Sequence, residues 1–237
     1  MPPHTAASPW AAPEQRSRSR DALRADKRAA VLRTAAKLFN EKGFHATSLD
    51  EVAERLHVTK PTLYHYVRSK DEILFECVKS GLQTMRDAIA ARLAAGGSAL
   101  DQLEAGMRAY TRIVTQDFGM CLIRIGEDPL PAESRTELRR LKREIDLEFR
   151  GLIARCVAEG SVRPVDPKLA AFTLAGALSW VGRWYRPGGP LAPEQIADAC
   201  CDLLLSGLRP PALTAPASPP ARRRSAPASR TATGDKR

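Results

Sequence analysis

The 237-residue chain has little of what stabilises small secreted folds or crosses membranes. Its five cysteines are odd in number and form no CxxC pair, so neither a disulfide framework nor a zinc site is indicated. The longest nearly apolar run, residues 170–182, is too short to span a bilayer. The first residues lack a charged segment followed by an apolar one, so no signal peptide is expected. We therefore expect a cytoplasmic protein with reduced thiols, no membrane contact and no metal site.

Catalytic signatures are also scarce. Of four histidines, His4 lies near the N-terminus and the other three fall between residues 45 and 65. The sequence has no glycine-rich phosphate loop, no HExxH motif and no grouping of Ser, His and Asp. Asp146 and Glu148 stand among arginines at helical spacing, which is typical of a solvated face. A helical enzyme is thus only an alternative, and we assign no catalytic residue and expect no cofactor.

Aromatic residues make up only 5% of the chain, whereas Ala and Leu are abundant, which favours helices. Strict two-residue alternation is almost absent, and apolar residues recur instead at helical spacing between Gly and Pro breaks. We predict an all-α fold with about nine helices. Their expected ranges are 24–42, 48–57, 59–67, 70–95, 98–116, 119–126, 131–159, 167–185 and 193–208.

The net charge of +10 is unevenly distributed. Residues 23–72 contain ten Lys or Arg against seven Asp or Glu, whereas residues 73–208 contain 17 of each. Residues 1–22 and 209–237 are rich in Pro, Ala, Ser and Arg, and we expect both to be disordered tails because they cannot bury enough apolar surface. A small basic module at 23–72, joined to a neutral body at 73–208, is typical of a protein that binds a polyanion.

The basic module contains two short helices joined by a tight turn. Ser48 and Glu51 have the spacing of a capping box at the start of the first, and Thr59 and Pro61 suit the N-cap and first turn of the second. Two short helices flanked by longer ones form a helix-turn-helix, whose second helix enters the major groove of DNA. Singly these residues would suit any surface, but their joint spacing and the local charge favour DNA binding.

The second short helix has an inward apolar face, formed by Leu63, Tyr66 and Val67. The opposite face presents groups that can contact base edges, namely Lys60, Thr62 and Tyr64, with Thr59 and Pro61 at the first turn. Groups able to reach phosphates are Tyr64, His65 and Lys70, together with Thr47 or Ser48 at the start of the preceding helix.

The stretch from about Arg28 to Leu74 closely resembles the DNA-binding domain of the TetR family. The matching runs are AAKLF at 35–39, GF at 43–44, TSLDEVA at 47–53 and KPTLYHYVRSKDEIL at 60–74. The resemblance implies base contacts by Thr59, Lys60, Pro61 and Thr62, and phosphate contacts by Thr47, Tyr64, His65 and Lys70. It also implies a transcriptional regulator, more often a repressor, that binds double-stranded DNA as a homodimer at a palindromic operator and is released by a small-molecule effector.

Residues 179–191 are similar to a segment of TetR-type repressors of fatty-acid and steroid catabolism, whose effectors are acyl-CoA thioesters. Arg183 and Arg186 can pair with phosphates, and Trp180, Trp184 and Tyr185 can stack on an adenine or line an acyl channel. Aromatic packing and surface arginines at a dimer interface are the alternative interpretation.

The last two predicted helices carry the expected dimer contact. Small residues line helix 167–185, and an apolar stripe follows helix 193–208. We expect two copies of these helices to form a four-helix bundle, with burial of the stripe inside one chain as the alternative. A non-specific DNA-coating protein is a further alternative, which would explain the arginines at 222–224 but not the neutral body.

Overall fold

The computed structural model describes residues 20–209, so the expected tails lie outside it apart from residues 20–22 and 209. Within these residues the chain forms nine α-helices and no strand, which confirms the all-α prediction. The helices are α1 (Arg20–Lys42), α2 (Leu49–Arg55), α3 (Lys60–Tyr64), α4 (Lys70–Ala94), α5 (Ala99–Val114), α6 (Asp117–Arg124), α7 (Ala132–Ala158), α8 (Pro167–Trp184) and α9 (Pro193–Ser206).

Two boundaries differ from the sequence prediction by three residues or more. Helix α3 ends at Tyr64, not at residue 67, so Tyr66 and Val67 lie beyond its end. Helix α1 begins at Arg20, not near residue 24, so residues 20–22 are helical although we expected them in the disordered tail. Asp21 lies in the first turn, where a carboxylate interacts favourably with the helix dipole.

Side chains at the helix starts explain most of the other boundaries. Five of the N-cap residues accept a hydrogen bond from the backbone three positions later, namely Ser48, Thr59, Ser69, Ser98 and Asp166. The capping box expected at α2 forms only in half: the Ser48 hydroxyl accepts from the Glu51 N–H at 3.1 Å, but the Glu51 carboxylate pairs with Lys42. The local signals therefore set where helices begin, while ion pairs between helices compete for the same side chains.

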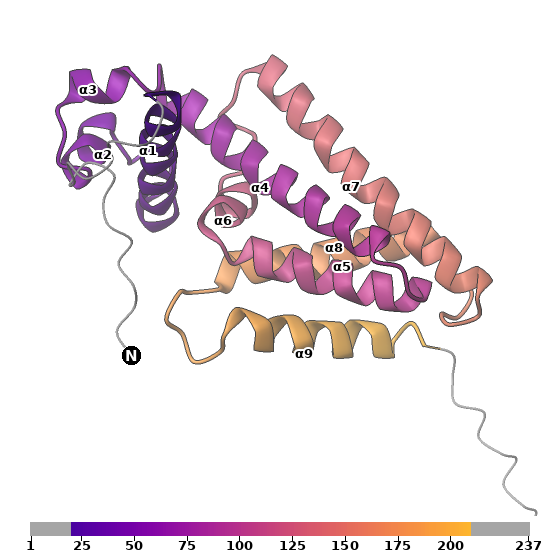
Figure 1. The fold of residues 1–237 in the computed structure, drawn as a ribbon. Coiled ribbons are helices and arrows are strands. Elements are labelled where there is room, and N and C mark those ends of the chain that lie inside the picture. Colours follow the sequence, from indigo (N-terminus) through magenta and orange to yellow (C-terminus); the bar gives the residue numbers. More distant parts are fainter. Residues whose placement is uncertain (1–19, 210–237) are drawn as a thin grey trace, which may run out of the picture.

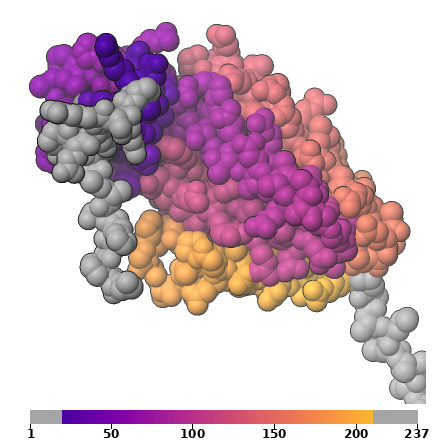
Figure 2. All heavy atoms as spheres, in the orientation of Figure 1, coloured from indigo at the N-terminus to yellow at the C-terminus, as the bar shows by residue number. Residues whose placement is uncertain are grey.

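The helices form a small module joined to a larger body (Figure 1). Helices α1, α2 and α3 lie together at one end, and α4 runs from this module into the body, where it packs against α5, α6 and α7. In Figure 2, α9 forms one edge of the body, while the module occupies the opposite corner. Buried apolar side chains form one continuous cluster from α1 to α9, so the module and the body share a core.

Helix α6 packs unusually closely against its neighbours. An ideal Cβ on Gly119 would lie 1.9 Å from the carbonyl oxygen of Ile113, and one on Gly81 of α4 would lie 3.2 Å from that of Phe118. Only glycine permits this approach at position 119. Because α6 also packs against α1 and α8, it lies between the module and the interior of the body.

The apolar stripe of α9 is partly buried within the chain and partly exposed. Ile196, Cys201 and Leu205 are buried within the chain, whereas Leu203 is 77% exposed and Ala199 is exposed. The small residues of α8 divide in the same way: Ala170 and Ala171 are buried, and Gly176 and Ala177 are exposed. Intrachain burial therefore explains one face of each helix and leaves the other face uncovered.

Candidate DNA interface and ligand pocket

The start of α3 projects from the module on a fixed base. The Thr59 hydroxyl accepts a hydrogen bond from the Thr62 N–H at 3.4 Å, and the two threonine hydroxyl oxygens lie 2.9 Å apart. Leu63 is fully buried, which holds the inner face of the helix in the core. Lys60, Pro61 and Tyr64 are exposed on the outer side, as expected for a helix that enters a groove.

Lys60 is paired within the module. Its ammonium lies 2.9 Å from the Asp50 carboxylate of α2, and this hydrogen bond and charge raise the pKa of Lys60. Both side chains are about half exposed, at 47% and 58%. A contact between Lys60 and DNA must therefore replace or share Asp50, whose part the sequence did not indicate.

Lys70 and Thr47 have contacts other than the phosphate contacts we expected. The Lys70 ammonium donates to the carbonyl oxygens of Phe44, Thr47 and His45 at 2.8, 3.1 and 3.3 Å, and it lies 4.5 Å from the centre of the Phe44 ring. Thr47 is buried, and its hydroxyl donates to the carbonyl of Gly43 at 2.9 Å. Since an ammonium has three N–H donors, the bonds within the chain account for all of them. Both residues hold the loop between α1 and α2.

The remaining phosphate candidates are accessible. Ser48 and His65 are exposed, and His65 shares a shallow depression with Arg20, Arg24 and Lys27 of α1. These three cationic residues add positive charge beside α3. Arg24 and Lys27 were counted in the predicted basic module, whereas Arg20 was missed because the helix was expected to begin after it.

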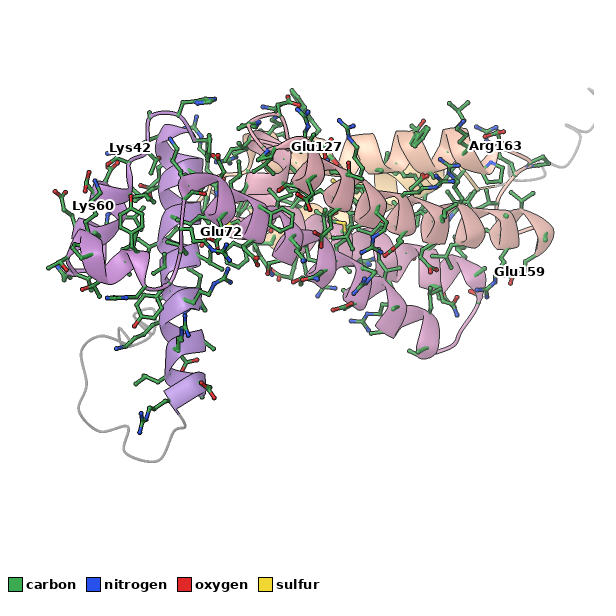
Figure 3. All side chains as sticks on the ribbon, turned by 90° about the horizontal axis from the view of Figure 1, so that it is seen from above. Lys42, Lys60, Glu72, Glu127, Glu159 and Arg163 are labelled. Atoms are coloured by element: carbon green, nitrogen blue, oxygen red, sulfur yellow. The ribbon has the colours of Figure 1, made fainter. Side chains whose placement is uncertain are left out.

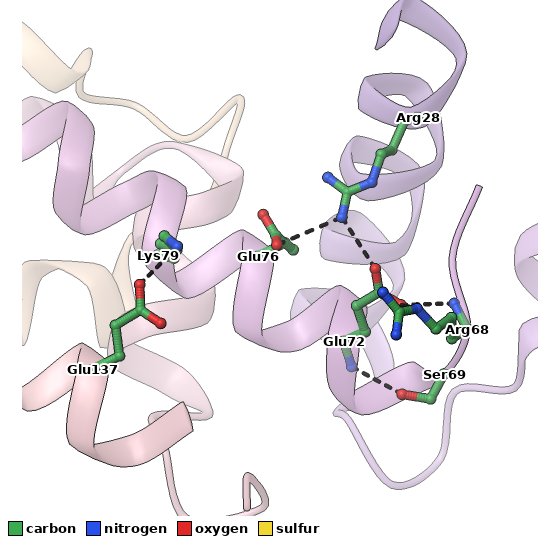
Figure 4. Close-up of polar contacts among 7 residues, drawn as sticks. All are labelled: Arg28, Arg68, Ser69, Glu72, Glu76, Lys79 and Glu137. Atoms are coloured by element: carbon green, nitrogen blue, oxygen red, sulfur yellow. Dashed lines mark hydrogen bonds and ion pairs between the residues drawn. The ribbon is translucent and has the colours of Figure 1, made fainter. Parts of the chain in front are cut away.

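Polar contacts tie α4 to both parts of the molecule (Figure 4). Arg28 of α1 lies 3.2 Å from the Glu72 carboxylate and 3.5 Å from that of Glu76. Further along α4, Lys79 lies 2.7 Å from Glu137 of α7. Helix α4 is therefore anchored to the module at Glu72 and Glu76 and to the body at Lys79.

The body encloses a pocket of about 490 Å³ between α4, α5, α6, α7 and α8. Its apolar lining includes Leu82, Met85, Leu122, Ile145 and Phe149. A concave, largely apolar pocket with a few polar groups is the usual form of a small-molecule site.

Two of the four predicted ligand-binding residues line this pocket. Trp180 and Arg183 do so, and both are exposed, Trp180 to 65%, so they lie at its opening. Trp184, the last residue of α8, and Arg186, which follows the helix, do not line it.

Two hydroxyl groups of the pocket lining were not predicted. Tyr110 of α5 and Ser179 of α8 are joined by a hydrogen bond of 2.7 Å. The Tyr110 ring also meets Phe149 edge-on, with ring centres 6.1 Å apart. Burial raises the pKa of Tyr110, so its hydroxyl stays protonated.

The charged residues around the pocket differ in their partners. Lys142 lies 2.8 Å from Glu127, and Asp146 accepts a hydrogen bond from Arg150 at 3.0 Å. Among residues 20–209, Arg183 has no acidic partner within ion-pair distance. The charge at the opening that lacks a counter-ion is therefore positive, which suits an anionic ligand.

Arg124, at the end of α6, links three segments through carbonyl groups. Its guanidinium donates to the carbonyls of Gly182 at 2.8 Å and Tyr185 at 2.6 Å, where α8 ends, and to that of Asn40 in α1 at 3.4 Å. The Asn40 amide in turn donates to the carbonyl of Asp117, the first residue of α6, at 2.9 Å. The end of α8 and the DNA-binding module are thus connected through one side chain.

Arg124, Arg183 and Arg186 form a positive cluster at this end of α8. Burial lowers the pKa of Arg124, and the charges of Arg186 and Arg183 add to this effect. Three arginines that repel one another favour an anion among them.

No group of three or more His, Cys, Asp or Glu within 20–209 is placed to hold a metal ion. None of the helices in that range is long and apolar enough to cross a membrane.

Comparisons with known proteins agree with this arrangement. A family model described as bacterial regulatory proteins of the tetR family matches residues 31–77, and one described as the tetracyclin repressor-like C-terminal domain matches residues 96–208. The HTH-type transcriptional repressor KstR2 of Rhodococcus jostii is 28% identical over 191 residues, which cover 78% of this chain and 92% of that protein.

Solved structures show the same similarity. The TetR family transcriptional regulator PfmR from Thermus thermophilus is 34% identical, with a TM-score of 0.69, covering 76% of this chain and 99% of that one. AibR, in complex with isovaleryl coenzyme A and operator DNA, is 28% identical, with a TM-score of 0.67, covering 74% and 96%.

Proposed function

The chain belongs to the TetR family of bacterial regulators, and we propose from this premise that it is a ligand-responsive repressor acting on DNA in the cytoplasm. The observation that carries the proposal is a pocket joined to a DNA-reading module by the shared helix α4. Figure 3 views this arrangement from above, with Lys42 and Lys60 of the module far from Glu159 and Arg163 of the body.

We assign the DNA contacts to the exposed residues of the module. Thr59, Lys60, Pro61 and Thr62 read base edges, since they form the projecting turn of α3. The phosphate contacts come from Ser48, Tyr64 and His65, which stay accessible. Thr47 and Lys70 act indirectly, by holding the loop that sets the position of α2.

Recognition of a palindromic operator requires a homodimer, and the uncovered faces of α8 and α9 suit that contact. Leu169 on α8 and Leu203 on α9 do not line the ligand pocket and are 67% and 77% exposed. Large apolar side chains left uncovered on these two helices suit an interaction surface. Exposed Ala177 allows a partner helix to approach α8 closely.

The effector that fits the pocket best is an acyl-CoA thioester. The apolar lining suits the acyl group, and Arg183, with Arg124 and Arg186 nearby, suits the phosphates of CoA. Trp180 at the opening and Trp184 beyond it can stack on the adenine. The related AibR supports this choice, because its structure contains isovaleryl coenzyme A.

Release from DNA follows if the ligand favours another arrangement of α4 and α6. Leu82 and Met85 of α4, and Leu122 of α6, contact the pocket, while both helices also contact α1. A dimer reads two half-sites only when its recognition helices have the right spacing, about 34–36 Å. The effector must therefore bind the DNA-incompetent state more tightly.

The test is to footprint the purified protein on genomic DNA and then titrate the operator complex with acyl-CoAs, the matching free acids and CoA alone. We expect an inverted repeat, and release by thioesters that is lost in Arg183→Ala while DNA affinity is kept. Arg143→Ala, an exposed arginine of α7 outside the pocket, is the matched control. Binding without sequence preference would contradict the regulator and support a DNA-coating protein. Failure of every thioester to release DNA would exclude this effector class.

A further inference from the structure

The hydrogen-bonded hydroxyls of Tyr110 and Ser179 are polar groups in an otherwise apolar part of the pocket lining. Tyr110 is 8% exposed, and its neighbours in the pocket include Phe149 and Met85. A hydroxyl buried among such groups is unfavourable unless its hydrogen-bonding capacity is used.

Ser179 differs from other hydroxyl residues in the helices of this protein. The hydroxyls of Thr84, Thr111, Thr136, Thr173 and Ser206 each donate to the backbone carbonyl four positions earlier. That local bond is the common choice for Ser and Thr inside a helix. Ser179 instead reaches across to α5, so its oxygen is held at the pocket lining.

The pair retains one unused donor. Each hydroxyl carries one hydrogen, and the bond between the two oxygens uses only one of them. Within residues 20–209, neither oxygen has a second hydrogen-bond partner. Among the described residues, no acceptor for the remaining hydrogen lies within hydrogen-bond distance, so it is available to a ligand in the pocket.

We propose that Tyr110 and Ser179 bind an oxygen atom of the effector, a carbonyl or hydroxyl oxygen on the part that enters the pocket. The inference rests on the proposed function of the pocket as the effector site, and it adds a selectivity for oxygen over plain hydrocarbon. Two sources have this chemistry in an acyl-CoA: the thioester carbonyl, and a keto or hydroxyl group further along the acyl chain. Because the ring of Tyr110 packs edge-on against Phe149 and its hydroxyl is held by Ser179, the donor is fixed before the ligand arrives.

The test compares two neutral probes of one shape, cyclooctanone and methylenecyclooctane, by ligand-observed NMR with full-length protein. Tyr110→Phe keeps the ring and removes the hydroxyl. We expect it to weaken cyclooctanone about fivefold and to leave methylenecyclooctane within about twofold. Ser179→Ala should likewise weaken the binding of cyclooctanone more than that of methylenecyclooctane. Met85→Leu changes the same pocket without touching a hydroxyl, and should not discriminate between the probes.

Thermal unfolding of each variant shows whether the fold is kept. An equal change for both probes in Tyr110→Phe, or no binding of either probe to the wild-type protein, would overturn the inference.

A second comparison identifies the source of the oxygen, using release of operator DNA by hexanoyl-CoA and 3-oxohexanoyl-CoA. A loss of response in Tyr110→Phe for the oxo compound alone assigns the site to the acyl oxygen, and an equal loss for both assigns it to the thioester carbonyl. If neither thioester binds while the ketone preference persists, the CoA effector is wrong and the hydroxyl site stands.

Discussion

The DNA-reading module and the helical body hold their functional side chains by different means. In the module they are exposed, lie close together in sequence and are paired with neighbours such as Asp50. In the body the pocket residues come from five helices, and close backbone packing positions them. The difference teaches that substitutions in the body should act mainly through packing and coupling, and those on the outer face of the module mainly through recognition.

The largest effect is expected where α6 meets α5. Gly119→Ala should lower the free energy of unfolding by about 3 kcal/mol, because the new Cβ would lie 1.9 Å from the backbone oxygen of Ile113. Urea unfolding measures this change. Gly151→Ala on α7 is the control: its Cβ meets nothing within 4 Å, and the change should be neutral or stabilising by up to about 1 kcal/mol. A Gly119→Ala protein as stable as wild type would show that the close packing of α6 is dispensable.

Two lysines of the module should have different roles: Lys70 supports a loop, and Lys60 recognises DNA. Lys70→Ala should lower the free energy of unfolding by about 2 kcal/mol, since it removes a charged donor from three carbonyl groups. Lys60→Ala should leave unfolding unchanged and reduce discrimination between operator and mismatched DNA about tenfold. Chemical unfolding and competition binding measure the two effects. If Lys70→Ala is as stable as wild type, and the slope of its log DNA affinity against log salt concentration is smaller by about one, Lys70 contacts a phosphate as the sequence predicted.

The coupling between the ligand pocket and the DNA-reading module should depend on Arg124. Arg124→Gln removes most of the bonds from α6 to the carbonyls of Gly182, Tyr185 and Asn40. We expect effector binding to persist while the effect of the ligand on operator affinity falls about fivefold or more. Parallel titrations with and without operator measure this. Arg112→Gln, whose contact stays within α5, should keep the wild-type coupling, and equal coupling in both variants would exclude Arg124 as the link.

The smallest effect is a pH dependence at the edge of the pocket. Burial alone would raise the pKa of Glu127, but hydrogen bonds from Lys142 and Arg139 outweigh it, and the pKa lies below its usual 4.5. The carboxylate therefore stabilises the fold above that value, and the contribution is lost as the pH falls through the lowered pKa. Glu127→Gln should flatten the decline of unfolding free energy between about pH 5 and pH 3. If the unfolding free energies of wild type and Glu127→Gln fall in parallel over this pH range, Glu127 does not have this role.

The sequence by itself determined the helices and the module. Caps such as Ser69 and Thr59, and breaks at Gly and Pro, act over a few residues, so they can be read along the chain. The N-terminal end of α1 was missed because the arginines before it have the composition of the tail. The outward residues of α3 were predicted for the same local reason.

Only the tertiary structure decided what the pocket contains and what Lys70 does. Tyr110 and Ser179 stand 69 residues apart, and the carbonyl partners of Lys70 lie 23 to 26 residues before it. Neither relation follows a helical period, so no pattern in the sequence marks it. Trp180 and Arg183 line the pocket and Trp184 and Arg186 do not, so the sequence grouped residues that the packing separates, and ligand binding by any of the four stays a prediction. Helix propensity is a property of neighbours in the chain, whereas a pocket is formed by the packing of helices, which brings distant side chains to one place.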